Sequence, residues 1–212
     1  MSKNDLSYNG SQGVFNRRFF LCPVLNNTAM EDLTTYCPDC SRLYALCCPD
    51  RDYTAQHGGT CHHYALVFTD GSCIGNGRDD AVAGMGVAIG LNGQEHQWAI
   101  PVDDSVDPGS PRTNQRAELL AAIEGLQKIC CSNGDYYAKA CEWRNNSCVI
   151  VVTDSEYVVK GITEYLPTWK ENNWRTPQGK AKRPKNADLF LKLDKLVNVL
   201  EAKHRINIGS GT

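Results

Sequence analysis

Short apolar runs separated by turn residues follow one another in the larger, C-terminal part of the chain. The run 64–69 (YALVFT) precedes the polar residues 70–72, which predicts a buried strand that ends in a turn. Segments 84–89 and 96–100 flank Asn92-Gly93, and both of these residue types tolerate positive φ, so a hairpin between two strands is predicted. Three strands in a meander are therefore expected first.

A helix and a further strand are predicted after the meander. The apolar residues of segment 113–129 recur at steps of three and four, with Glu118 near the start, which indicates an amphipathic helix. They are Leu119, Ile123, Leu126 and Ile129. The run 149–153 (VIVVT) predicts a second buried strand, and a helix over 157–166 should end at Pro167, which lacks the amide donor.

The last helix is predicted from Asn186, because leucines recur there at steps of four, three and four, followed by residues 205–208 and a Gly-Ser-Gly-Thr tail. The resulting order β-β-β-α-β-α-α predicts an α/β fold, a mixed sheet with helices packed on it. Residues 1–62 are polar, rich in cysteine and weakly periodic, unlike the rest. We therefore expect an N-terminal extension over 1–62 and a main domain over 63–212.

Composition and charge narrow the possible partners. With 42% hydrophobic and 22% charged residues and no apolar run long enough for a bilayer, the chain is typical of a soluble globular protein. The N-terminus does not resemble a signal peptide, so we expect an intracellular protein of the nucleus or cytoplasm with no membrane partner. No protein partner is indicated.

A net charge of −2 gives no general basic surface for a nucleic acid, so any such surface must be local. The one clearly basic segment runs from 170 to 185, where Glu171 is the single acid. Its basic residues are Lys170, Arg175, Lys180, Lys182, Arg183 and Lys185. The segment is either a phosphate-contacting loop or a solvated surface.

The chain contains 11 cysteines, an odd number without even spacing, which argues against a disulfide scaffold. Cys37-Pro38-Asp39-Cys40 has the two-residue gap of a zinc knuckle. The candidate ligands for Zn²⁺ are Cys37, Cys40, Cys61 and His62, with Cys47, Cys48 and His63 as further donors. The alternative is a small extension with unpaired, reduced cysteines.

Three acids occupy positions where a charge needs compensation. Asp70 follows the first predicted strand, Glu118 lies in the first helix, and Asp154 follows the strand 149–153. Burial and mutual repulsion would raise the pKa values of clustered acids, and a divalent cation such as Mg²⁺, which prefers oxygen ligands, relieves the repulsion. Taken singly, Asp70 and Asp154 also fit ordinary turn and helix-capping positions.

Four blocks in a fixed order resemble the motifs of the type 1 ribonuclease H family. They are 69–72 (TDGS), 113–119 (TNQRAEL), 153–155 (TDS) with Tyr157, and Trp169-Lys170 with Asn173-Trp174 and Thr176. The resemblance covers about residues 63–205. It implies a ribonuclease H-like mixed sheet of five strands with flanking helices, the last strand being short or incomplete.

The resemblance also implies the chemistry. Asp70, Glu118 and Asp154 would be the catalytic residues and would hold two Mg²⁺ ions, with Mn²⁺ as an alternative, around the scissile phosphate. Asp70 would bridge them. One ion would activate the attacking water and the other would stabilise the departing 3′ oxygen. The implied activity is endonucleolytic hydrolysis of the RNA strand of an RNA–DNA hybrid, which leaves 5′-phosphates and 3′-hydroxyls.

Contacts to the hybrid are implied as well. Asn114 and Gln115 match family positions that recognise the ribose 2′-hydroxyl, and the loop 167–186 is similar to the family's substrate-handling protrusion. Alternatively, Asn114 and Gln115 are merely exposed at a helix start, and Trp169 belongs to the core. The predicted substrate contacts are Gly71, Ser72, Thr113, Asn114, Gln115, Trp169, Trp174, Thr176 and Lys180.

The family pattern continues beyond the last helix with a strand and then a segment that carries a final metal-binding Asp. No acid in these 212 residues matches that position, and the nearest, Glu201, lies on the last predicted helix. The alternative function is therefore a catalytically impaired module that binds hybrids. A third interpretation, a ribonuclease H domain separated from a mobile-element polymerase, would need polymerase sequence upstream.

Overall fold

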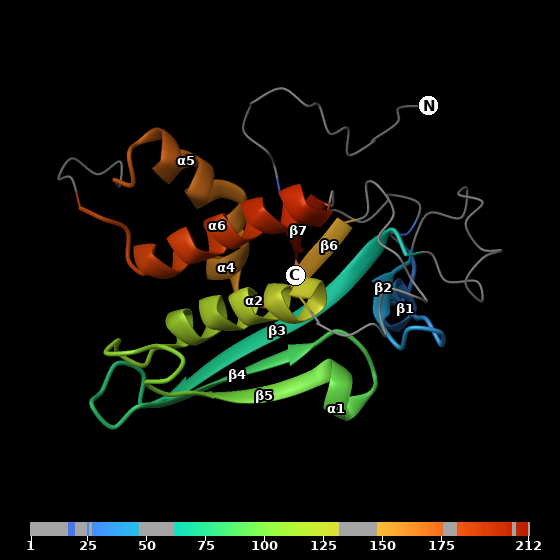
Figure 1. Ribbon diagram of the computed structural model, residues 1–212, viewed down its shortest axis with the longest axis horizontal. Helices are drawn as coiled ribbons and strands as arrows, with labels where there is room; N and C mark the ends of the chain where they lie inside the picture. Colours follow the sequence, from blue (N-terminus) through green and yellow to red (C-terminus); the bar gives the residue numbers. More distant parts are fainter. Residues whose placement is uncertain are drawn as a thin grey trace.

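A computed structural model describes residues 17–19, 25, 27–46, 62–131, 148–175, 182–204 and 207–211, which form one seven-stranded sheet with helices packed on it (Figure 1). The strands are β1 (Thr34–Tyr36), β2 (Leu43–Ala45), β3 (Tyr64–Ile74), β4 (Val82–Ala88), β5 (Gln97–Val102), β6 (Cys148–Val152) and β7 (Asn207–Gly211). The helices are the 3₁₀ turn η2 (Met30–Leu33), α1 (Gly93–His96), α2 (Asn114–Cys131), α4 (Glu156–Lys160), the π-helical η3 (Gly161–Tyr165), α5 (Leu166–Glu171) and α6 (Ala187–His204).

Strand β3 is central, because other strands pair along both of its edges. β6 runs parallel to its first half, with Tyr64 opposite Cys148 and Phe68 opposite Val152. β4 runs antiparallel to its second half, β5 pairs with β4, and β7 pairs in parallel with β6. The predicted mixed α/β sheet is confirmed. Its parallel strands bring the residues that follow Phe68 and Val152 to the same end of the sheet.

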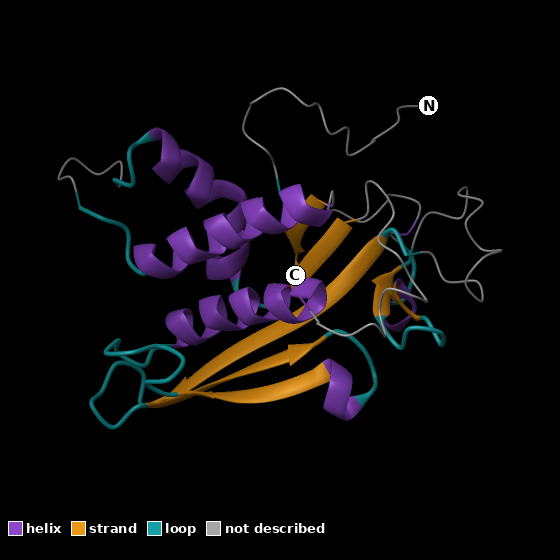
Figure 2. Ribbon diagram, in the orientation of Figure 1, coloured by secondary structure: helices purple, strands orange, loops and turns teal. Residues whose placement is uncertain are grey.

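Helices α2 and α6 lie side by side against the sheet (Figure 2). The main core lies beneath them and contains Val67, Val149 and Ile208 from the strands and Leu119 and Phe190 from the helices. A smaller cluster, Leu66 and Ile150 with the partly buried Phe19, covers the opposite side of β3 and β6. The two clusters alternate along β3, as side chains of a strand do. Among the described residues no helix is both long and apolar enough to cross a membrane.

The N-terminal segment contributes two strands that the sequence pattern did not indicate. β2 meets β3 at Tyr44 opposite Ala65, beside the part of β3 that β4 does not reach. The Leu43 N–H also donates to the Ile89 carbonyl at 2.9 Å, which joins β2 to the end of β4. Strands of three residues are too short for a visible alternation of apolar and polar positions, so only main-chain pairing defines them.

The last strand, expected to be short or incomplete, pairs with β6 along the whole of β6. Glu201 near the end of α6 accepts the Ile208 N–H at 3.0 Å and forms an ion pair with Arg17. Backbone hydrogen bonds between Ser210 and residues 17–19, at 2.8 and 2.9 Å, attach the N-terminal segment to the outer edge of β7. Residues 207–211 are therefore a strand of the sheet, and residues 17–19 are hydrogen-bonded to its edge.

Asp70 lies inside β3 rather than at a turn, which corrects the predicted strand end. The strand continues to Ile74 because β4 pairs with it there, and the chain reverses only at Gly75 and Gly77, with φ of 75° and 80°. Asn92-Gly93 likewise does not form the predicted hairpin turn. Asn92 has φ −74°, and α1 follows it before β5, although β4 and β5 do pair antiparallel as predicted.

Pro167 does not end the second helical region, contrary to the sequence prediction. α4, η3 and α5 follow one another without interruption from residue 156 to residue 171. Proline occupies the first turn of α5, where its fixed φ is favourable and its missing amide proton costs little. The π-helical turn before it changes the helical register at the point where the proline enters.

Candidate active site

Three acids are brought together by the parallel strands and by the close packing of α2 on β3. Asp70 and Asp154 each lie two residues past the last β3–β6 pair, at the same end of the sheet. α2 crosses β3 so closely that a Cβ added to Gly71 would lie 2.3 Å from the Glu118 nitrogen. Glycine at position 71 thus allows the helix to place Glu118 beside the two aspartates.

The two aspartates affect the pKa of Glu118. Burial raises the pKa of Glu118, a hydrogen bond from the Ser155 hydroxyl opposes the rise, and the charges of Asp154 and Asp70 raise the pKa further. Its Oε2 atom is buried and has no hydrogen-bond partner among the described residues. A buried carboxylate oxygen beside like charges is costly, and a divalent cation with oxygen ligands removes that cost. These residues fit Mg²⁺ or Mn²⁺.

Replacing Glu118 by Gln should stabilise the metal-free protein at neutral pH. Because the pKa of Glu118 is raised from 4.5 in the folded protein, its stabilising contribution is complete below pH 4.5 and is lost as the pH rises through the folded pKa. At neutral pH, where the carboxyl is ionised in the unfolded chain, the raised pKa therefore lowers the free energy of unfolding, and a neutral amide does not have this effect. Thermal unfolding from acid to neutral pH, with and without Mg²⁺, measures this.

In the same experiment, Mg²⁺ should raise the melting temperature of the parent and have little effect on Glu118→Gln, because ligand binding to the native state stabilises it. Glu124→Gln, on the same helix but paired with Lys128, is the matched control and should keep the Mg²⁺ response. A Glu118→Gln protein that is less stable than the parent at neutral pH, or that responds fully to Mg²⁺, contradicts the prediction.

Ser155 is a site residue that the sequence analysis did not single out. Its hydroxyl donates to Glu118 and accepts the Val158 N–H at 3.4 Å, which caps the start of α4. A serine after a buried strand is a common helix cap, so the block 153–155 held part of the signal. Only the packing of α2 against this turn revealed the bond to Glu118.

Arg116 is a second residue that the sequence analysis missed. It is buried, donates two hydrogen bonds of 2.8 Å to Asp107, and donates a third of 2.7 Å to Asp188 at the start of α6. The bond to Asp107 raises the pKa of Arg116 and lowers the pKa of Asp107. Arg116 thereby joins the loop after β5, α2 and α6, and it holds the helical turn that carries Glu118.

The first turn of α2 exposes two of the predicted substrate contacts. Asn114 and Gln115 are exposed, as is Ser72 on β3. Thr113, by contrast, is used in the fold, because its Oγ1 accepts the Arg116 N–H at 3.3 Å and caps the helix. Of the predicted substrate contacts that the structure describes at this end of the sheet, the two amides and the Ser72 hydroxyl are therefore exposed to a ligand.

Trp169 packs against the core. Its ring lies 5.0 Å from the Phe190 ring in an edge-to-face arrangement and 6.4 Å from the Trp174 ring. Asn173 and Trp174 have φ of 51° and 59°, and the Trp174 N–H donates to the Trp169 carbonyl at 2.6 Å. This tight turn folds Trp174 back beside Trp169. Both side chains remain partly exposed, at the end of α5.

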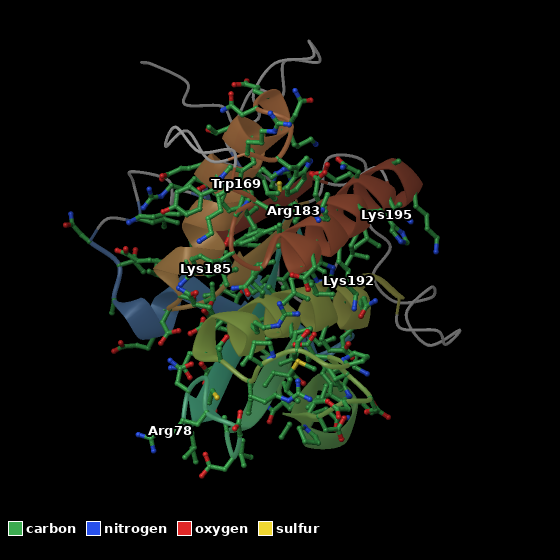
Figure 3. The ribbon with its side chains drawn as sticks, turned by 90° about the vertical axis from the view of Figure 1, so that its left-hand side faces the viewer. Arg78, Trp169, Arg183, Lys185, Lys192 and Lys195 are labelled. Atoms are coloured by element: carbon green, nitrogen blue, oxygen red, sulfur yellow. The ribbon has the colours of Figure 1, made fainter. Side chains whose placement is uncertain are left out.

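Basic side chains gather near the connection from α5 to α6. Figure 3 shows Arg183 and Lys185 below Trp169 in that view, and both residues are exposed. The Lys185 carbonyl accepts a hydrogen bond of 3.2 Å from the Tyr157 hydroxyl, which ties this connection to α4. Thr176 and Lys180, two predicted substrate contacts, lie outside the described residues.

Of the candidate zinc ligands, three come together in the N-terminal segment. One ligand atom from each of Cys37, Cys40 and His62 lies within 4.8 Å of the other two. Cys61 lies outside the described residues. The three ligands stand at the start of β3, and Asp70 lies six residues beyond Tyr64, where the strand begins. The cysteine cluster and the acid cluster are thus separate sites.

The fold and the acid cluster define an α/β domain with a carboxylate site at the end of its parallel strands. The chain belongs to the ribonuclease H family, because a family model described as RNase H matches residues 62–209. The resemblance inferred from the motifs is confirmed.

Two curated relatives agree with this assignment. Ribonuclease H of Pseudomonas entomophila is 39% identical over 136 residues, which cover 62% of this chain and 72% of that protein. Ribonuclease HI of Pseudomonas aeruginosa is 38% identical over 145 residues, which cover 66% and 75%. Among solved structures, the solution structure of the PFV RNase H domain shares 26% identity at a TM-score of 0.44, over 70% of this chain and 78% of that one.

Proposed function

We propose that this chain binds an RNA–DNA hybrid and hydrolyses its RNA strand by metal-dependent phosphodiester cleavage. The observation that carries the proposal is the buried, unpartnered Oε2 of Glu118 beside Asp70 and Asp154. Clustered carboxylates of this kind are ligands for the hard divalent cations that assist phosphoryl transfer. Membership of the ribonuclease H family supplies the substrate class.

The chain's own residues have distinct tasks in this proposal. Asp70, Glu118 and Asp154 would hold the ions, which supply charge stabilisation for the attacking water and the departing 3′ oxygen. Ser155 orients Glu118 by donating to its carboxylate. Arg116 keeps α2 in register with α6 through Asp188, so that Glu118 stays at the end of the sheet.

Asn114 and Gln115 are proposed to distinguish RNA from DNA. They lie four and three residues before Glu118, about one turn of the same helix, so they are close to the metal-binding carboxylate. A side-chain amide offers both a donor and an acceptor, and a ribose 2′-hydroxyl can pair with either. Their exposure leaves both groups available to a nucleic acid.

A hybrid-binding module of low activity is the second candidate, and the position of Glu201 favours it. This acid is committed to Arg17 and to the Ile208 N–H, so it does not supply a fourth ligand. The described residues then offer three carboxylates at the site. Such a module would recognise the hybrid through the same surface while cleaving it slowly.

Binding of a hybrid should weaken steeply with salt, and neutralising Arg183 and Lys185 should make that dependence shallower. Each phosphate contact releases counterions and contributes about 0.9 to the slope of log affinity against log salt for a B-form duplex. The double variant Arg183→Gln/Lys185→Gln should therefore lower the slope by up to about 2. Fluorescence anisotropy of a labelled hybrid over a salt series measures it.

Two comparisons make this test specific. Lys195→Gln/Lys203→Gln removes the same charge farther along α6 and should leave the slope unchanged. DNA duplex of the same sequence should bind more weakly than hybrid, and Asn114→Ala/Gln115→Ala should narrow that difference. Equal affinity for hybrid and DNA duplex would count against the proposed substrate, and an unchanged slope in the Arg183/Lys185 variant would show that these residues are only solvated surface.

A further inference from the structure

Three metal-ligating side chains from two distant segments meet beside the start of β3. Cys37 and Cys40 lie in the turn between β1 and β2, and His62 precedes β3. Their ligand atoms all lie within 4.8 Å of one another. A tetrahedral zinc ion with bonds of about 2.0–2.3 Å spaces such ligands roughly 3.5–3.8 Å apart. Closing the three onto an ion therefore requires shifts of about 1 Å or less.

A tight turn carries both cysteines and holds them close together. The Ser41 N–H donates to the Cys37 carbonyl at 2.8 Å, and Ser41 has φ 56°, so the chain reverses directly into β2. This turn presents Cys37 and Cys40 to a common point.

Tyr44 orients the other two ligands. Its hydroxyl lies 3.3 Å from the Cys40 sulfur, and its ring stacks on the His62 imidazole with centroids 4.2 Å apart and planes at 13°. Tyr44 is itself buried and paired with Ala65 of β3. Groups that contact the ligands of a metal in this way hold them in the binding geometry. Cys37 is fully buried, whereas Cys40 and His62 are partly exposed.

We propose that Cys37, Cys40 and His62 bind one Zn²⁺ ion that fastens the β1–β2 hairpin to the start of β3. Two thiolates and an imidazole favour zinc over Mg²⁺, which requires oxygen ligands. The fourth position is left to water or to a further side chain, and the proposal depends on the three residues alone. It does not depend on the proposed nuclease function.

The ion has a structural role. At about 3.3 Å per residue, the six residues from Tyr64 to Asp70 separate the start of β3 from the acid cluster by roughly 20 Å. The ion is thus too far away to take part in chemistry there. β1 and β2 have three residues each, too few for a stable hairpin in isolation. Metal binding to such a segment contributes directly to its folding free energy.

The first measurement is the zinc content of the full chain, purified from cells grown with zinc and dialysed against metal-free buffer. The parent should contain about one zinc per chain, and Cys37→Ser, Cys40→Ser and His62→Asn should contain almost none. Cys148→Ser is the matched control, because Cys148 lies on β6 outside the cluster, and it should keep the ion. A strong chelator should lower the melting temperature of the parent and of Cys148→Ser.

A second measurement keeps the proposal testable if the cysteine variants fail to fold. Cobalt(II) added to the zinc-depleted parent should give the intense visible absorption of a tetrahedral thiolate site, and one equivalent of zinc should abolish it. Metal-free parent with reduced cysteines and no such absorption would overturn the proposal. So would an intact mass lowered by two hydrogens through a disulfide between Cys37 and Cys40, or full zinc occupancy in Cys37→Ser and His62→Asn.

Discussion

A C-terminal extension that supplies one further carboxylate should raise hybrid cleavage by on the order of 10² to 10³ relative to residues 1–212 alone. Cleavage with two metal ions stabilises both the attacking and the departing oxygen, so a missing ligand should impair turnover far more than binding. Asp70, Glu118 and Asp154 would retain an ion, whereas Glu201 is committed to Arg17. Residues 1–212 should therefore bind a hybrid but cleave it slowly.

The measurement is the initial rate of cleavage of a labelled hybrid with and without Mg²⁺. The extension, taken from a ribonuclease H relative, is joined after residue 212, and the same extension with Asn in place of its acid is the matched control. Both fusions should bind the hybrid equally, and Asp70→Asn should abolish cleavage by the active one. Rapid Mg²⁺-dependent cleavage by residues 1–212 alone would refute this prediction and mean that water or another group completes the coordination.

Replacing Arg116 by Ala should lower the free energy of unfolding by about 3–5 kcal/mol, the usual cost of removing one partner of a buried ion pair. The variant leaves Asp107, only 5% exposed, without its main hydrogen-bond donor. Because Arg116 lowers the pKa of Asp107 below 3.8, the stabilisation is present above pH 3.8 and is lost as the pH falls through the folded pKa. The difference in the free energy of unfolding between parent and variant should therefore become smaller in acid.

Urea unfolding at several pH values measures this effect. Lys170→Ala is the control, because Lys170 forms an ion pair with Asp194 at the surface, and such pairs contribute about 0–1 kcal/mol. Asp107→Asn combined with Arg116→Ala should recover part of the loss, since no unpaired charge is then buried. If Arg116→Ala costs no more than Lys170→Ala, Arg116 does not hold α2 in the way proposed.

Local hydrophobic periodicity by itself determined the main elements of this protein. The apolar runs that became β3 and β6 are buried on both faces, and such strands read as continuous apolar stretches. Leucines at helical spacing determined α6, because the same residues had to share one face towards the core. The short blocks around Asp70, Glu118 and Asp154 also identified the family, since their residue types and order are local information.

Where the local backbone preference of a residue conflicted with its surroundings, tertiary contacts decided which structure formed. Gly71 looks like a turn residue, yet it is a strand residue because β4 pairs with β3 there, and its lack of a side chain lets α2 pass directly over it. Pro167 looks like a helix terminator, yet it lies in the first turn of α5, directly after a π-helical turn. Asn92 could adopt a hairpin turn but instead precedes a short helix whose last residue, His96, is buried.

Only the tertiary structure could reveal the contacts that assemble the two sites. Arg116 donates hydrogen bonds to Asp107 and Asp188, which lie 9 and 72 residues away in the sequence. Ser155 interacts with Glu118 from a different element. The cysteine turn likewise meets His62 only because β2 pairs with β3. Burial recurs with the period of a helix or strand and is therefore visible in sequence. Single hydrogen bonds, ion pairs and metal ligands have no period, because they depend on where whole elements come to lie.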